Sequence, residues 1–122
     1  MPIQVEWGIE EKNLIRWNFV GKWTAQELRA TIQKSNEMFA TQDHTVNHII
    51  DLSQAESLPA NVINEIRLAM RQMPENLGQL VVIVQGGIIE GMGETLQRFS
   101  WFSKKIHVVR SNADALAYIG SA

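Results

Sequence analysis

The chain has 122 residues, 45% of them hydrophobic, which is an ordinary size for one domain with one core. It has no cysteine, and this excludes a disulfide framework, a thiolate nucleophile and a sulfur-ligated zinc site. Its net charge of -2, with lysine and arginine scattered along the chain, offers no basic patch to a nucleic-acid backbone. We therefore expect a single domain, residues 1–122, that does not bind nucleic acid.

Neither a signal peptide nor a membrane span is indicated. The first twenty residues carry acidic side chains where a signal peptide has a basic start and an apolar stretch. No apolar run approaches the roughly 20 residues that a membrane-spanning helix needs. The expected location is cytoplasmic.

Two strands are expected first. Apolar and polar residues alternate over 3–7 and again over 14–19, with a polar break of about six residues between them. This period of two predicts an antiparallel hairpin with Trp7 and Trp17 in its core. Gly21 ends the second strand, and Thr24 with Glu27 forms a capping-box pattern, which predicts a helix from about 25 to about 40.

Strands and helices are then expected to alternate. The run HIIDL (48–52) is typical of a central strand that is buried on both faces. An apolar stripe from Val62 to Met73 predicts a second helix, ended by Pro74 and by an Asn-Leu-Gly turn with Gly78 in the left-handed region. LVVIVQ (80–85) predicts the next strand, the stripe from Ile89 to Phe102 a third helix, and KIHVVR (105–110) the last strand. A final short helix is expected after Ser111, which is its predicted N-cap.

The predicted order is β-β-α-β-α-β-α-β-α, an α/β fold. Right-handed crossovers then require the last three strands to be parallel. We expect a mixed sheet, with an N-terminal antiparallel hairpin followed by parallel strands, covered by about four helices.

Three segments resemble the SpoIIAA-like branch of the STAS superfamily, bacterial domains best known as anti-sigma factor antagonists. They are FVGKWT (19–24), IIDLS (49–53) and NADALAYI (112–119), and their order and spacing carry the resemblance. It implies the same mixed fold and a regulatory role exerted through protein partners.

The resemblance also implies a phosphorylatable Ser or Thr at the start of the helix after the IIDLS strand. A phosphate there would bind the free N–H groups and the positive end of the helix dipole. Matched by spacing from Asp51, the position falls near Pro59 and Asn61, where the usual hydroxyl is missing. Ser57 is the nearest substitute, although a serine just before a helix usually serves as its cap. The expected residues of this switch turn are Asp51, Ser53, Glu56, Ser57 and Asn61.

Other candidate chemistry is weak. Asp51 at the end of a parallel strand is placed as ligand sites are in open α/β sheets, with Glu56 as a base beside it, but the favoured interpretation is that Asp51 accepts backbone N–H bonds in the turn. His44 and His48 have a metal-like spacing only if both lie on one helix, and a zinc site needs a third ligand such as Asp43. His107 is expected to be a packed or edge residue. The glycines of 86–93 do not complete a nucleotide-binding motif.

The apolar residues around the predicted third helix favour a contact surface. Exposed aromatic and methionine side chains on a domain of this size usually mark a partner or ligand surface, although a wide helix face that covers the sheet explains them equally well. The expected interface or ligand patch comprises Trp23, Ile88, Ile89, Met92, Trp101 and Phe102.

Two functions follow from the sequence. The first is a non-catalytic regulatory or protein-interaction module, a homodimer through residues 88–102, with no cofactor and no metal. The alternative is a binding or carrier domain for a small apolar ligand or lipid, for which Met70, Met73, Met92, Phe99 and Phe102 supply helical apolar side chains. An enzyme would need a base or nucleophile close to a second group, and the sequence offers only Asp51, Glu56 and scattered histidines.

Overall fold

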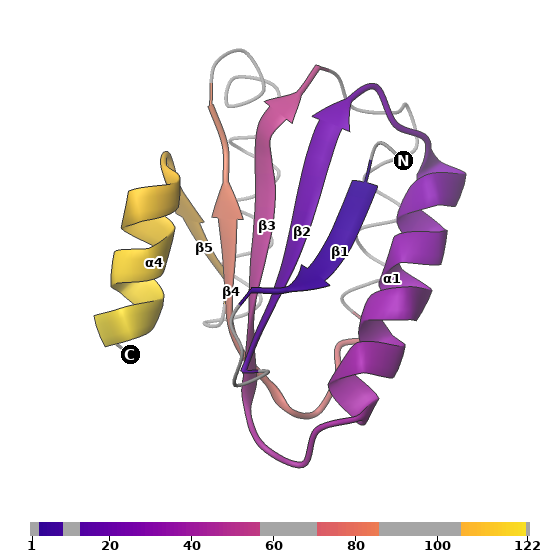
Figure 1. Cartoon of the computed structure of the whole chain (residues 1–122), viewed down its shortest axis with the longest axis vertical. Coiled ribbons are helices and arrows are strands. Elements are labelled where there is room, and N and C mark those ends of the chain that lie inside the picture. The colour runs from indigo at the N-terminus through magenta and orange to yellow at the C-terminus, as the bar shows by residue number, and fades with distance from the viewer. Residues whose placement is uncertain (1–2, 9–12, 57–70, 86–105, 122) are drawn as a thin grey trace.

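A computed structural model describes residues 3–8, 13–56, 71–85 and 106–121. Five strands form one sheet in the spatial order β1-β2-β3-β4-β5, which is also their order along the chain (Figure 1). β1 is antiparallel to β2, and each later neighbour pair is parallel, as the α/β prediction requires. The strands are β1 (Ile3–Trp7), β2 (Leu14–Gly21), β3 (Val46–Ala55), β4 (Leu77–Ile83) and β5 (Ile106–Val109).

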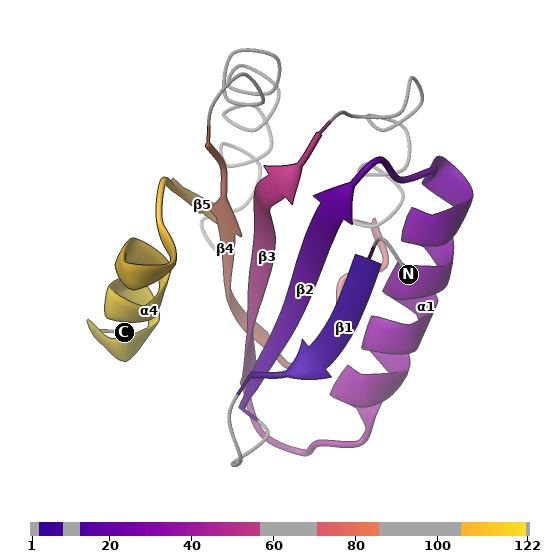
Figure 2. The ribbon, with the colours of Figure 1, turned by 45° about the horizontal axis from the view of Figure 1, so that its top comes forward.

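Two helices lie within the described residues, on opposite faces of the sheet (Figure 2). They are α1 (Ala25–Ala40) and α4 (Asn112–Ser121). The second and third helices predicted from the sequence fall almost wholly at 57–70 and 86–105, outside the described residues. No helix in the described ranges is long and apolar enough to cross a membrane.

Both described helices begin where the sequence predicts. The Glu27 N–H donates to Thr24 Oγ1 at 3.1 Å, and the Thr24 N–H donates to Glu27 Oε1 at 3.1 Å, which confirms the capping box. The Asp114 N–H donates to Ser111 Oγ at 3.1 Å, which confirms Ser111 as the cap of α4. These local bonds satisfy N–H groups that a helix start otherwise leaves without partners.

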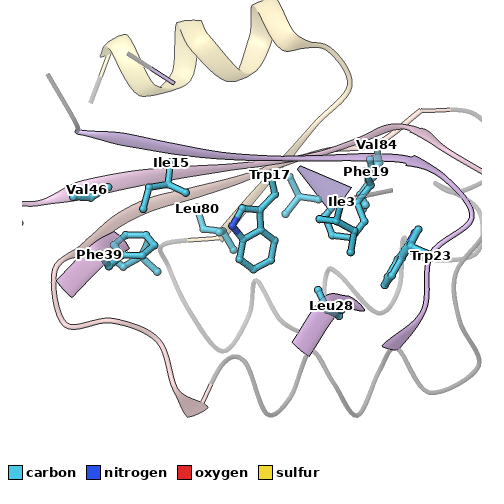
Figure 3. Close-up of a cluster of buried hydrophobic side chains, with 13 residues drawn as sticks. Ile3, Ile15, Trp17, Phe19, Trp23, Leu28, Phe39, Val46, Leu80 and Val84 are labelled. Atoms are coloured by element: carbon cyan, nitrogen blue, oxygen red, sulfur yellow. The ribbon is translucent and has the colours of Figure 1, made fainter. Parts of the chain in front are cut away.

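The larger hydrophobic cluster lies between the sheet and α1, and most of its buried side chains are labelled in Figure 3. Trp17 is buried there and Trp7 packs against it from a half-buried position, as expected for the hairpin core. A second cluster, of Leu14, Ile49, Val81, Ile83 and Ala115, lies on the α4 face. The alternation of side chains along each strand therefore sends one set to each helix.

β3 is longer than the predicted strand. It runs on from Leu52 to Ala55 because β2 continues beside it, with Val20 paired to Gln54 and Gly21 to Ala55. The expected polar turn after Asp51 is therefore strand. Pairing with a neighbour overrides the weak strand preference of these polar residues.

The predicted Asn-Leu-Gly turn is also wrong, because β4 already begins at Leu77 and Gly78 lies within it. Gly78 is needed there for space: a Cβ atom would overlap the side chains of Asn47 and Thr45, beside an irregularity in the β3–β4 pairing. Asn47 Oδ1 uses this close approach to accept the Gln79 N–H at 2.9 Å. Among the described glycines, the left-handed conformation occurs instead at Gly21, where φ is 68°.

Candidate functional site

A polar surface lies on the α4 side of β1, β2 and β3. Two cross-strand rows build it, Glu6–Arg16–Ile49 and Gln4–Asn18–Asp51. Among the described helices, α4 packs over β3 and β4 on this side. We call the five polar residues of these rows the open sheet face: Gln4, Glu6, Arg16, Asn18 and Asp51.

Arg16 is the centre of this face. Its guanidinium donates from Nη2 to Asp51 Oδ2 at 2.6 Å, from Nη1 to Asn112 Oδ1 at 2.6 Å and from Nε to Asn18 Oδ1 at 2.9 Å. The planar, rigid fork of donors makes such three-way contact possible. Arg16 therefore joins β3, the start of α4 and its own strand.

Asp51 is fully engaged by this arrangement. Oδ2 pairs with Arg16, and Oδ1 accepts the Ser53 N–H at 2.9 Å and the Ser53 hydroxyl at 2.6 Å. The side chains of Arg16 and Asp51 are only 18% and 16% exposed, so solvent screens the pair less than it screens a surface pair.

The structure thus corrects the predicted position of Asp51, which lies inside β3 with four strand residues after it. The expectation that it accepts a backbone N–H is confirmed at Ser53. Glu56 is exposed just beyond β3, and its side chain takes no part in the described bonds of Asp51.

Arg16 and Asn112 also belong to the site, although neither was predicted from the sequence. Arg16 lies 35 residues before Asp51 and Asn112 lies 61 residues after it, and only the pairing of β2 with β3 and the packing of α4 on the sheet bring them together. The available signal was a pair of opposite charges, each on a strand position facing the same side.

Several expected site residues lie outside the described residues: Ser57, Asn61, Ile88, Ile89, Met92, Trp101 and Phe102. Trp23, the remaining member of the expected apolar patch, is 6% exposed and packs edge-on against Phe19 at 4.8 Å between ring centroids. Trp23 is a core residue, so it does not form part of an exposed apolar patch.

The histidines occupy three different environments. His48 is buried on the α1 side of the sheet, whereas His44 is exposed with Nδ1 3.7 Å from Asp43 Oδ1. Within the described part of the chain, no three or more His, Asp or Glu residues are grouped to hold a metal ion. His107 is a packed residue of the edge strand β5, as predicted, with Nε2 2.9 Å from Gln79 Oε1 and its ring 4.2 Å from that of Tyr118.

The pKa of His48 is strongly displaced. Burial lowers the pKa of His48 from 6.5 to about 3, because the apolar surroundings disfavour the charged ring. The rings of Trp17 and Phe39 meet it edge-on, at 4.4 and 5.9 Å between centroids. His48 is therefore neutral at physiological pH.

Four buried polar atoms on the α1 side have no hydrogen-bond partner within the part of the chain that the structure describes. They are Trp17 Nε1, Trp23 Nε1, Ser35 Oγ and His48 Nε2. An unsatisfied buried polar group costs about 1–3 kcal/mol of stability. The core next to α1 therefore contains polar atoms without hydrogen-bond partners, although most of its side chains are apolar.

Comparison with known proteins leaves the geometry as the guide to function. The chain matches no protein-family model, and no curated protein matches it.

We expect the Arg16–Asp51 pair to stabilise the fold. Arg16→Met should lower the free energy of unfolding by about 2 kcal/mol, between the values typical of exposed and buried pairs, because it leaves a half-buried carboxylate without its cation. A double-mutant cycle with Asp51→Asn, measured by urea unfolding, should give a coupling energy of about 1–2 kcal/mol. Lys34→Met on the exposed side of α1 is the control, and it should show no coupling with Asp51→Asn. A coupling energy near zero between Arg16→Met and Asp51→Asn would contradict the expectation.

We expect His48 to make the protein sensitive to acid. Well above pH 6.5 neither state binds a proton at His48, so stability does not depend on this residue. As the pH falls through 6.5, the unfolded chain gains a proton that the folded chain does not bind until about pH 3. Stability should therefore fall with pH through this window, by about 2 kcal/mol between pH 6.5 and 5. His48→Phe should lose that component in urea unfolding, whereas exposed His44→Gln should keep it. Equal acid sensitivity of both variants would refute the assignment.

Proposed function

We propose that this protein is a non-catalytic regulatory or protein-interaction module of the SpoIIAA-like kind, and that it binds a protein partner through the open sheet face. The observation that carries the proposal is the network centred on Arg16, which fixes a polar, partly exposed surface on a sheet. Gln4 and Glu6 are exposed at its edge. They are the groups that a partner would meet first.

The rigidity of this face supports binding. Strand backbones hold Arg16 and Asp51 in register, and hydrogen bonds fix both side chains before any partner arrives. Because these side chains lose little freedom on binding, the entropic cost of forming an interface is reduced. Polar interfaces of this type are common in regulatory complexes, where bridging water completes the contacts.

The chemistry of the partner follows from the charges. Arg16 and Asp51 neutralise each other, so the carboxylate of Glu6 leaves the face with one net negative charge. Glu6 makes one weak contact within the network, accepting from Asn18 Nδ2 at 3.2 Å. Val20, 47% exposed on β2, adds an apolar contact. We infer a protein partner that presents a lysine or arginine to Glu6 beside a small apolar surface.

A non-catalytic role fits the state of Asp51. A general base must be free to accept a proton from a substrate, and both oxygens of Asp51 already accept from Arg16 or Ser53. The Ser53 hydroxyl is likewise committed to Asp51, so it is a poor substitute for the missing switch residue. We therefore propose a module whose binding does not depend on phosphorylation of Ser53.

Glu6→Lys tests the partner surface. Proteins retained by the tagged chain are purified singly, and the Kd of each is measured against the wild type, Glu6→Lys and the control Glu37→Lys on exposed α1. Reversing the charge of Glu6 should raise the Kd of the relevant partner about tenfold or more, and a tenfold change corresponds to about 1.4 kcal/mol of binding free energy. Glu37→Lys should leave the Kd unchanged. If a partner binds the Glu6→Lys variant as tightly as the wild type, the open sheet face is not its binding site.

We also propose that two copies associate through residues 88–102, on the sequence evidence alone, since this segment lies outside the described residues. Light scattering should give twice the 13.8 kDa mass of the chain at high concentration. Trp101→Ala should shift the equilibrium towards the monomer, because interfaces depend strongly on buried tryptophan. Glu6→Lys should not. A 13.8 kDa mass at all concentrations would exclude the dimer.

A further inference from the structure

Two of the buried polar atoms without partners belong to rings that contact each other on the α1 side, and a third, Ser35 Oγ, lies on the helix that packs over these rings. The His48 ring contacts the Trp17 ring, and Phe39 contacts His48 from the helix. Ser35 precedes Phe39 by four residues on α1, so both side chains project from the same face of the helix. We call Trp17, Ser35 and His48 the core polar cluster. Each is more than nine-tenths buried.

The cluster lies inside the larger hydrophobic core. Figure 3 shows the Trp17 ring extending from the sheet into the layer that also holds Phe39 and Leu28 of α1. Trp23, the fourth residue with an unpartnered atom, lies towards the other end of this layer and is not part of the cluster. The half-buried Met73 packs against the same core, and a flexible methionine can rearrange to admit a guest.

The donor and acceptor types define what the cluster can bind. The indole N–H of Trp17 only donates, the Ser35 hydroxyl donates or accepts, and His48 Nε2 does either according to its tautomer. All three can therefore bond an uncharged oxygen atom. An anion is disfavoured, because the buried described residues around the cluster supply no cation and His48 itself is neutral there.

Ordinary packing does not explain the cluster. Native interiors leave few buried polar atoms without partners, and leucine, alanine or phenylalanine at these positions would avoid the cost. A bound group that satisfies them explains three such atoms in the layer between α1 and the sheet. A buried water molecule is the simplest alternative occupant, and the experiment below separates it from a ligand.

We propose that the layer between α1 and the sheet binds an apolar molecule carrying one uncharged oxygen, such as an alcohol or ketone, with that oxygen at Trp17, Ser35 and His48. Its hydrocarbon part lies among the apolar side chains of the core. This goes beyond the interaction role, and it gives a definite ligand class and position to the carrier function that the sequence left as an alternative.

The test compares three probes of equal chain length with the full-length protein at pH 7.5: 1-octanol, octane and octanoate. Tryptophan fluorescence and thermal unfolding should show saturable binding of 1-octanol and a rise in Tm of several degrees. Octane and octanoate should bind at least about fivefold more weakly, since one lacks the hydrogen-bonding oxygen and the other must bury a charge. Failure of 1-octanol to bind, as expected if water alone occupies the cluster, or equal binding of octane, overturns the proposal.

Variants locate the site. Ser35→Ala removes one unpartnered atom and should fold well, yet weaken 1-octanol binding about threefold to tenfold by removing one hydrogen bond. His48→Phe keeps an aromatic ring but loses the ring nitrogen, so it should also weaken 1-octanol binding. Unchanged 1-octanol affinity in Ser35→Ala overturns the proposal even if the His48 variant is unstable. Glu6→Lys, which alters the opposite face, should bind 1-octanol as wild type does, so this test fails or succeeds independently of the partner surface.

Discussion

The parallel pairing of β2 with β3 is the interaction on which the rest of the structure depends. Successive residues of a strand point to opposite faces, so one register creates both notable features of the molecule. It brings Arg16 to Asp51 on the α4 side and Trp17 to His48 on the α1 side. A slip of one residue would exchange the faces, placing a charged pair in the core and aromatic rings on the surface.

The two features obey different physical rules. A charged pair that is partly exposed can be satisfied by its partners and by water, and Arg16 and Asp51 make five described hydrogen-bonded contacts between them and their neighbours. A deeply buried group has only what the core provides, so His48 remains neutral and Ser35 remains unsatisfied there. The first arrangement stabilises the fold, whereas the second lowers its stability.

Local signals predicted the elements, and long-range pairing decided the site. The capping box at Thr24 and the alternation of the hairpin act over a few residues, and each appears where expected. The end of β3 lies later in the chain than expected, because pairing with β2 keeps Ser53 and Gln54 in the strand despite their weak strand preference. Asp51 was recognised, but its cation comes from a strand 35 residues earlier, and no sequence pattern gives a parallel register. The burial of Trp23 was missed because a residue just before a helix is equally compatible with the surface.

Strand β2 also connects the two proposed binding surfaces, since Arg16 and Trp17 are adjacent along it. A ligand that moved the Trp17 ring would act on the same backbone that positions Arg16 and Asn18 for a partner. Any such coupling must be reciprocal: the factor by which the ligand changes partner affinity is the factor by which the partner changes ligand affinity. It also requires that β2 takes different positions in two conformational states of the protein. A ligand that binds both states equally does not shift the equilibrium between them. The rigidity that favours the open sheet face for binding thus limits how strongly the core can regulate it.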